Sequence, residues 1–286
     1  TKTDYEIALT RVACERAAEG HRAAHGCFLD GGSERDVTLA YLRAADQLEA
    51  DLPYDAIVAF DEKAAVLHYE NKRGADAAPG RLLLLDAGAG HHGYASDISR
   101  TWTVDDAPDA MRALVEGVDA LERRLVEAIA PGRDFAELHL EAHRGVAELL
   151  HEVGIVRSSP AEAVDRQLTR AFFPHGIGHG LGLAVHEVGG RLADPDGGER
   201  TPPDGHVLRT TRRLEPGHLV TIEPGLYFIP MLLEPWRQGA DAAVVDWDLV
   251  DQLTPFGGVR IEDDVLCTDD GFEDLTRPLL AGPRGV

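Results

Sequence analysis

The order of helical and extended patterns is the feature of this sequence that most restricts its fold. Two helical patterns come first, and a group of short extended segments follows them over residues 56–104. The same order then returns, with two helical patterns up to Gly154 and two extended segments over 219–225 and 257–267. Helices and sheets each bury one face against another layer. This order therefore predicts an α/β (α+β) chain in which a curved, mainly antiparallel sheet is backed by two helix pairs.

Apolar residues at helical spacing locate the four helices. The first runs from Tyr5 to about Phe28, with a predicted apolar face of Tyr5, Leu9 and Val12. The second follows Ser33, with a predicted apolar face of Val37, Tyr41, Ala45 and Leu48. The third stops at Pro131-Gly132 and carries Met111, Leu114, Val118, Leu121, Leu125 and Ile129. The fourth is capped by Asp134, with Glu137 three residues later, and is expected to bury Phe135, Leu138, Ala142, Val146 and Leu149.

Short runs of apolar and β-branched residues predict the strands. They are residues 56–60, 65–69, 81–88, 94–104, 219–225 and 257–267. The leucines at 82–85 form the longest aliphatic run, which suits a buried strand and is far too short to span a bilayer. Residues 155–218 are rich in glycine and proline and are expected to be irregular. No shift in composition marks a linker, so residues 1–286 are expected to form one domain.

The net charge of −22 argues against one class of partner. Such an acidic surface repels phosphate backbones, which disfavours nucleic-acid binding, and it suits cations where carboxylates converge. Cys14, Cys27 and Cys267 are too few and too scattered for a disulfide framework, and the first residues lack a secretory pattern. We therefore expect a cytoplasmic protein with reduced thiols and no membrane association.

The segment FFPHGIGHGLGLAVHE, residues 172–187, places His175, His179 and His186 among four glycines. Glycine is unfavourable inside a helix, and position 176 is not the glutamate that a helical zinc-binding pair requires. We expect a loop that passes close over a site, with one histidine as a ligand and two facing substrate. GAGHHG at 88–93 matches a dinucleotide fingerprint, but a strand-like segment follows it where a helix is needed, which excludes a nucleotide site.

Four acids stand within or at the ends of the predicted strands: Asp86, Asp97, Glu223 and Glu262. Each alone has an ordinary explanation as a turn or loop acid, but several carboxylates buried together need compensating cations. Two divalent cations would neutralise the four charges, and one imidazole would complete the ligand set. Oxygen-rich coordination with a single histidine favours Mn²⁺, with Co²⁺ or Zn²⁺ as alternatives. The set predicts a hydrolase with two metal ions.

Five motifs in this order resemble those of the pita-bread metallopeptidases: LLLLDAG (82–88), YASDISRTW (94–102), PHGIGHGLGLAVHE (174–187), LVTIEPGLYF (219–228) and FGGVRIEDDV (256–265). Three more narrow the resemblance to bacterial Xaa-Pro dipeptidases, or prolidases: KTDYEIAL (2–9), DLPYDAIVAF (51–60) and AVLHYEN (65–71). The resemblance implies the pita-bread fold, with pseudo-two-fold symmetry, over residues 1–286. It also implies that the family's N-terminal domain is absent from this chain and that the full-length protein is a homodimer.

The resemblance implies roles for twelve residues. The metal ligands it implies are Asp86, Asp97, His179, Glu223 and Glu262. Glu223 is also implied as the proton shuttle, and the other catalytic-site residues are His186, His175 and Arg260. The substrate-binding residues are His68, Arg209, Tyr54 and Leu208. Among these, Arg209 is implied to pair with the proline carboxylate and His68 to help hold the proline end.

The activity implied by the resemblance is hydrolysis of the Xaa-Pro bond of dipeptides by a hydroxide that bridges two divalent metal ions. The partner is then a small peptide with proline in the second position. Two alternatives stay open: an Xaa-Pro aminopeptidase that acts on longer peptides, and a pita-bread binding module without catalysis. A fixed cation at Arg209 favours dipeptides, and the five filled ligand positions argue against the binding module.

Overall fold

The computed structural model of the chain describes residues 1–74, 79–193 and 196–281. Its helices are α1 (Asp4–Leu29), α2 (Glu34–Ala44), α3 (Asp109–Glu127), α4 (Phe135–Glu152), α5 (Pro160–Asp165), α6 (Thr169–Phe172), α7 (Pro230–Gln238), α8 (Trp247–Leu253) and α9 (Arg277–Leu280). Its strands are β1 (Ile57–Phe60), β2 (Leu82–Asp86), β3 (Gly90–His91), β4 (Tyr94–Ala95), β5 (Ser99–Thr103), β6 (Leu219–Ile222), β7 (Gly225–Tyr227), β8 (Gly258–Arg260), β9 (Asp263–Cys267) and β10 (Phe272–Asp274). Over the described ranges, we find no helix with the length and apolar character needed to cross a membrane.

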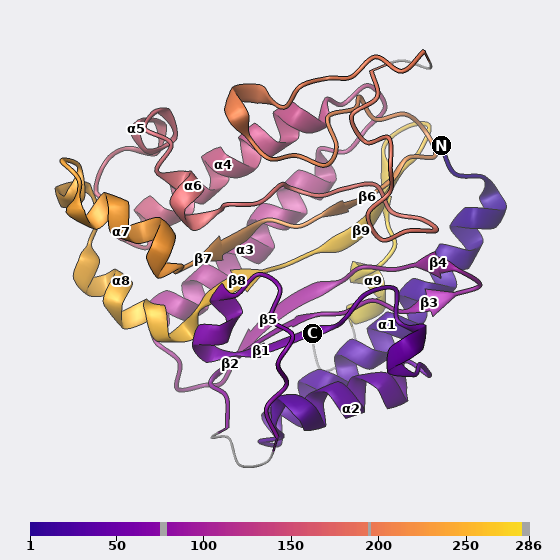
Figure 1. The fold of residues 1–286 in the computed structure, drawn as a ribbon, viewed down its shortest axis with the longest axis horizontal. Helices are drawn as coiled ribbons and strands as arrows, with labels where there is room; N and C mark the ends of the chain where they lie inside the picture. Colours follow the sequence, from indigo (N-terminus) through magenta and orange to yellow (C-terminus); the bar gives the residue numbers. More distant parts are fainter. Residues whose placement is uncertain (75–78, 194–195, 282–286) are drawn as a thin grey trace.

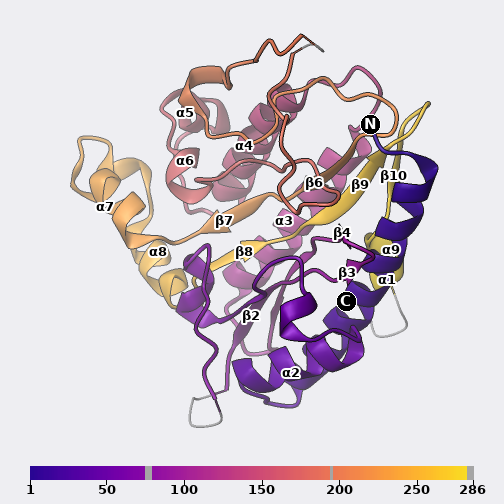
Figure 2. The same ribbon diagram turned by 45° about the vertical axis from the view of Figure 1, so that its right-hand side comes forward.

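Two three-stranded antiparallel sheets form the centre of the molecule (Figure 1). Their strand orders are β1-β2-β5 and β10-β9-β6, and a β-bridge between Ser99 and Glu262 joins them. Strand β7 pairs with β8 in a separate antiparallel ribbon. The strands β1, β2 and β5 follow the helix pair α1–α2 in the chain, and β6, β9 and β10 follow the pair α3–α4. The repeated order and the α/β class predicted from the sequence are therefore confirmed. Figure 1 shows α3 and α4 behind β6 and β9, and Figure 2 shows α1 and α9 together beside β10.

Strand β2 is buried on both faces, which explains its unbroken run of leucines. Leu82 and Leu84 belong to the large core that also contains Met111 of α3. Leu83 and Leu85 belong to a second core with α1 and α2. Side chains alternate along a strand, so β2 supplies both cores at once. Its last residue, an aspartate, is thereby held at a fixed point between the two helix pairs.

Helices α3 and α4 pack closely through two glycines. A Cβ added to Gly117 would lie 2.3 Å from a methyl carbon of Leu149, and one added to Gly145 would lie 2.3 Å from a methyl carbon of Leu121. Each leucine therefore fills the space left by the glycine on the opposite helix. The apolar faces predicted for these two helices are confirmed, because all eleven named residues are buried.

Of the apolar face predicted for the first helix, Leu9 and Val12 are half-buried, but the prediction is wrong for Tyr5. Tyr5 is 69% exposed, and α1 instead buries small residues such as Ala13, Ala17 and Ala24. Small residues allow α2 to approach closely, and a Cβ on Gly20 would lie 2.6 Å from the ring of Tyr41. For the second helix, three of the four predicted residues are buried, and the fourth, Leu48, lies beyond the end of α2 and is 72% exposed.

Several strand boundaries also differ from the prediction. Residues 65–69 do not form a strand, because this stretch continues from the 3₁₀ turn η2 (Asp61–Ala65), which packs against η5 (Thr254–Phe256). Residues 94–104 and 257–267 each break in the middle, since β4 and β8 belong to two-stranded ribbons whereas β5 and β9 belong to the sheets. Residues 155–218 contain α5 and α6, and α7 and α8 follow β7; none of these four helices was predicted.

Candidate metal centre

The five predicted metal ligands come from both halves of the chain and line one cavity of about 740 Å³. Four are acids at strand ends or in the breaks between strands: Asp86 at the end of β2, Asp97 between β4 and β5, Glu223 after β6 and Glu262 between β8 and β9. The other seven predicted site residues line the same cavity. The structure therefore brings all twelve together.

The loop that carries His179 is fastened along β6. The N–H of Thr221 donates to the carbonyl oxygen of His179 at 2.9 Å, and the N–H of Glu223 donates to the carbonyl oxygen of Ile177 at 2.8 Å. A Cβ on Gly178 would lie 2.0 Å from the carbonyl oxygen of Thr221. Glycine is therefore required where the loop approaches the strand most closely, and this approach places His179 beside Glu223.

Three of the five predicted ligand side chains meet directly. One ligand atom from each of Asp97, His179 and Glu262 lies within 4.8 Å of the other two. The Nε2 atom of His179 is 3.4 Å from Oδ2 of Asp97 and 3.7 Å from Oε1 of Glu223. The imidazole thus faces carboxylates that come from opposite halves of the chain.

Asp86 is oriented by a phenol and a guanidinium. The hydroxyl of Tyr54 lies 2.8 Å from Oδ1 of Asp86 and 2.5 Å from Oδ1 of Asp97. Arg260 donates from Nη2 to Oδ2 of Asp86 at 2.7 Å. A phenol has only one proton to donate, so Tyr54 links two carboxylates that compete for it. Although Tyr54 was predicted to bind substrate, its hydroxyl contacts two of the predicted ligands.

Glu262 is oriented through Ser99. The hydroxyl of Ser99 donates to Oε2 of Glu262 at 2.6 Å and accepts from Nε of Arg260 at 3.1 Å. Arg260 also donates from Nη1 to the hydroxyl of Tyr227 at 2.9 Å. Arg260 thus reaches two of the predicted ligands, Asp86 directly and Glu262 through the serine hydroxyl.

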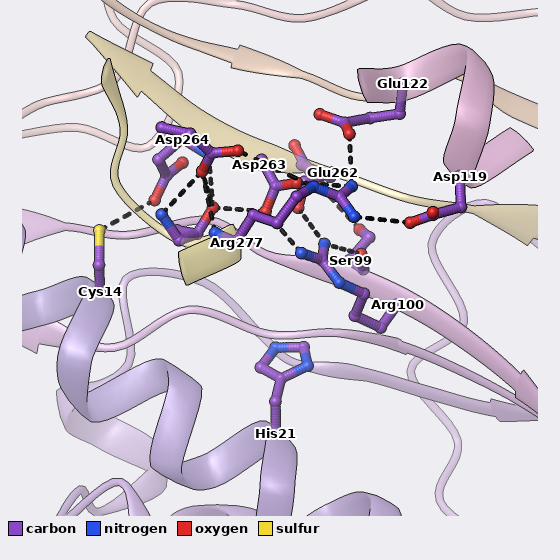
Figure 3. A network of polar contacts seen from close by, with 12 residues as sticks. Cys14, His21, Ser99, Arg100, Asp119, Glu122, Glu262, Asp263, Asp264 and Arg277 are labelled. Atoms are coloured by element: carbon purple, nitrogen blue, oxygen red, sulfur yellow. Dashed lines mark hydrogen bonds and ion pairs between the residues drawn. The ribbon is translucent and has the colours of Figure 1, made fainter. Parts of the chain in front are cut away.

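A buried polar network fixes the backbone on either side of the site (Figure 3). The carboxylate of Asp264 accepts from the N–H of Asp97 at 3.0 Å. The guanidinium of Arg100 donates to the carbonyl oxygen of Glu262 at 2.7 Å and to the carboxylate of Asp263 at 2.6 Å. Asp264 from the second half of the chain therefore fixes the backbone of Asp97, and Arg100 from the first half fixes the backbone of Glu262.

The acids of the site outnumber its positive charges, and their pKa values reflect this. Burial raises the pKa of Asp97, raises that of Glu262 well above its ordinary value, and raises that of Glu223 to about 7. Burial alone would lower the pKa of His179, but its hydrogen bond to Asp97 and the charge of Glu223 raise it to about 9. Buried acids in such excess retain protons that cations would displace. Four carboxylates and one imidazole are therefore a donor set that fits two divalent cations.

Two further histidines border the ligands. His175 contacts the hydroxyl of Tyr227 through Nε2 at 2.8 Å, and its Nδ1 lies 3.6 Å from Oε2 of Glu223. The ring of His186 packs edge-on against the ring of His179, with 4.3 Å between centroids, and its side chain is exposed to the cavity. Partial desolvation and the charge of His179 lower the pKa of His186 to about 4.

The other predicted substrate-binding residues are His68, Arg209 and Leu208, which line the same cavity. His68 and Arg209 are exposed, whereas the side chain of Leu208 is fully buried. Arg191 donates to the carbonyl oxygen of Leu208 from Nε at 2.9 Å and from Nη2 at 2.7 Å. This contact fixes the segment that carries Arg209.

Sequence reasoning missed several residues that shape the site. Ser99, Tyr227 and Arg191 bond directly to predicted site residues, and Arg100 and Asp264 hold the backbone beneath them. A usable signal existed for four of them, because Ser99, Arg100, Tyr227 and Asp264 stand inside the quoted motifs YASDISRTW, LVTIEPGLYF and FGGVRIEDDV. Arg191 stands outside all the quoted motifs.

The chain is similar to known proteins in both sequence and structure. The sequence model of metallopeptidase family M24 matches residues 8–269. An Xaa-Pro dipeptidase of Xanthomonas campestris pv. campestris (strain B100) is 48% identical over 283 residues, covering 99% of this chain and 64% of the relative. One of Stenotrophomonas maltophilia (strain R551-3) is 46% identical over 286 residues, covering 100% of this chain and 64% of the relative. The chain thus spans 64% of the length of these curated relatives.

Solved structures of similar fold include two aminopeptidases. Proline aminopeptidase P II from Yersinia pestis superposes with a TM-score of 0.78 at 30% identity, covering 99% of this chain and 58% of that one. Zinc-substituted aminopeptidase P from E. coli, in complex with product, also gives a TM-score of 0.78 at 30% identity, covering 99% of this chain and 57% of that one. These matches confirm the predicted pita-bread fold.

Proposed function

We propose that this chain, which belongs to metallopeptidase family M24, carries the active site of a metal-dependent dipeptidase that hydrolyses Xaa-Pro bonds. The observation that carries the proposal is the meeting of Asp97, His179 and Glu262, with ligand atoms within 4.8 Å of one another, in a cavity of about 740 Å³. A cavity of this volume suits a small ligand. Relatives that are 46–48% identical bear the name Xaa-Pro dipeptidase, which supports the choice of substrate.

Asp86, Asp97, His179, Glu223 and Glu262 would hold two divalent cations. When bound, such ions lower the pKa of a water molecule and polarise the carbonyl group to be attacked. Four carboxylates with one imidazole favour Mn²⁺ over softer ions. The ligand positions are all filled by side chains able to coordinate, which weighs against a binding module without catalysis.

Glu223 and His186 would act on the reacting atoms. Glu223, whose Oε1 lies 3.7 Å from Nε2 of His179, can take a proton from the attacking water and pass it to the nitrogen of proline as the C–N bond breaks. His186 is exposed to the cavity next to His179, where its N–H can donate to the oxygen of the former carbonyl. His175 and Arg260, which share the hydroxyl of Tyr227, would keep this part of the cavity rigid.

Arg209 would select for dipeptides. Arg209 is exposed and lines the cavity, where its guanidinium can pair with the carboxylate of proline, and His68 lines the same cavity. A tripeptide has an amide at that position in place of the carboxylate, so it would lose the charged contact. The likeness to aminopeptidase P structures favours a second candidate function, release of the N-terminal residue from longer Xaa-Pro peptides.

The test compares Ala-Pro and Leu-Pro with a tripeptide such as Ala-Pro-Ala. We expect cleavage of the dipeptides, loss of activity after dialysis against a chelator, and recovery on addition of Mn²⁺. Glu262→Gln serves as the inactive control. Activity that survives thorough metal removal would refute the proposed chemistry, and faster cleavage of the tripeptide would establish the aminopeptidase instead.

We also infer that the protein works in the cytoplasm and that its full-length form is a homodimer. Cys14, Cys27 and Cys267 are free thiols, as a reducing compartment requires. Light scattering on the full-length protein should give twice the mass of one chain, and a monomer mass at micromolar concentration would disprove the dimer.

A further inference from the structure

A second group of potential ligands lies outside the acid-rich site. His139 and His143 are one turn apart on α4 and are only 1% and 3% exposed. His206 follows the 3₁₀ turn η3 (Pro203–Gly205) and packs its ring against both of them. One ligand atom from each ring lies within 4.8 Å of the other two. Residues at positions i and i+4 share a helix face, so α4 presents two imidazoles to the third.

The hydrogen bonds of the group leave it incompletely satisfied. His139 Nε2 lies 2.8 Å from His206 Nδ1, and His143 Nδ1 lies 2.9 Å from the hydroxyl of Thr169. His139 Nδ1 is buried and has no hydrogen-bond partner among the described residues. The nitrogen of His139 that faces His206 is Nε2, and this is the atom that would bind an ion.

The distances are close to those of a metal site. Two nitrogens bound to one tetrahedral zinc ion at about 2.0–2.1 Å lie about 3.4 Å apart. The contact between His139 and His206 would have to open by about 0.6 Å, which a small rotation of the half-buried His206 ring can provide. The contact from His143 Nδ1 to Thr169 fixes that ring and leaves its other nitrogen for an ion, as is usual for histidine ligands.

The charge state of the rings suits coordination. Burial lowers the pKa of His139 to about 2 and that of His143 to about 3, so both are neutral and keep a lone pair. The positive charge of Arg170 lowers both pKa values further. The same charge would also oppose a bound cation, so only an ion that bonds strongly to nitrogen would be retained. Zn²⁺ and Cu²⁺ meet this condition, whereas Mn²⁺ and Ca²⁺ do not.

We propose that His139, His143 and His206 form a binding site for a borderline divalent cation such as Zn²⁺ or Cu²⁺, separate from the acid-rich site. The ion would tie the segment before Arg209 to α4. This segment matters because Val207 and Leu208, which follow His206 directly, line the main cavity. The two sites differ in donor type, with three imidazoles in one and four carboxylates with one imidazole in the other.

The experiment adds one equivalent of Cu²⁺ to the chain after it has been loaded with Mn²⁺ and desalted. Electron paramagnetic resonance then counts the nitrogen atoms bound to Cu²⁺, and elemental analysis after a second desalting gives the retained copper. The acid-rich site has one imidazole among its predicted ligands, so coupling to three nitrogens that disappears in His206→Gln is the signature of the histidine group. The variants are His206→Gln and His143→Gln, and His151→Gln on the same helix is the matched control.

We expect wild type and His151→Gln to retain about one Cu²⁺ with three nitrogen donors. His206→Gln should lose this signal and bind Cu²⁺ at least about tenfold more weakly, with unchanged circular dichroism. His143→Gln should behave in the same way. Equal copper retention in wild type and His206→Gln, or coupling to no more than one nitrogen in wild type, would overturn the inference. Neither readout depends on peptidase activity, so the outcome is independent of the proposed function.

Discussion

Replacing Gly178 with alanine tests whether the close contact between the histidine loop and β6 holds the site together. The new Cβ would lie 2.0 Å from the carbonyl oxygen of Thr221, so the two backbones must separate by about 1 Å or more. That separation breaks the hydrogen bonds from Thr221 to His179, at 2.9 Å, and from Glu223 to Ile177, at 2.8 Å. At about 1 kcal/mol for each bond, the free energy of unfolding should fall by about 2 kcal/mol.

The effect on catalysis should be larger than the effect on stability. His179 and Glu223 would both move by about 1 Å, and a displacement of that size can reduce kcat/KM about 100-fold. Urea unfolding and Ala-Pro hydrolysis measure the two effects. Gly26→Ala is the control, because a Cβ there meets no described atom within 4 Å. It should leave activity unchanged and stabilise α1 by about 0.5–1 kcal/mol. If Gly178→Ala matched wild type in both assays, the contact would not position the ligands.

Three further substitutions, of His21, Ser99 and Arg209, have expected effects on stability, metal affinity and substrate binding. Burial lowers the pKa of His21 from 6.5 to about 4, so between these pH values the unfolded chain binds a proton that the folded chain does not. The free energy of unfolding therefore falls as the pH falls through this window, by about 3 kcal/mol in total. His21→Gln should flatten the slope of the urea midpoint against pH, and an unchanged slope would contradict this. Ser99→Ala should weaken metal binding about 10- to 100-fold, because Glu262 loses the hydroxyl that donates to it. Competition with a chromophoric chelator measures the affinity, and an unchanged affinity would show that Ser99 does not position Glu262. Arg209→Gln should raise the KM for dipeptides about tenfold and leave that for tripeptides unchanged, whereas an equal rise for both would show that Arg209 does not bind the carboxylate.

The positions of Asp86 and Glu223 could be predicted from the sequence because each is marked by a strong local pattern. Asp86 ends a run of four leucines that is buried in two cores, so its direction is fixed by the strand itself. Glu223 follows β6 directly and precedes a proline-glycine pair. In both cases the hydrophobic strand and the polar residue after it are neighbours in the chain, and periodicity alone finds them.

Features that depend on distant partners could not be predicted in this way. Asp97 and Glu262 were predicted as ligands, but the breaks in which they lie were not, because each extended run exchanges one pairing partner for another and pairing leaves no local trace. The buried face of α1 was missed because its packing uses alanine and glycine, which give little contrast in hydrophobicity. The histidine group escaped notice because His206 is 67 positions from His139 and belongs to a loop.

The exchange of contacts between the halves has a consequence for the order of synthesis. Arg100 holds the carbonyl of Glu262, and Asp264 holds the N–H of Asp97, so neither segment is supported until both have left the ribosome. A nascent chain that has produced Asp86 and Asp97 still lacks the partners that would bring them into register. The proposed metal site therefore cannot form until translation has passed Asp264, and a shorter nascent chain would lack it.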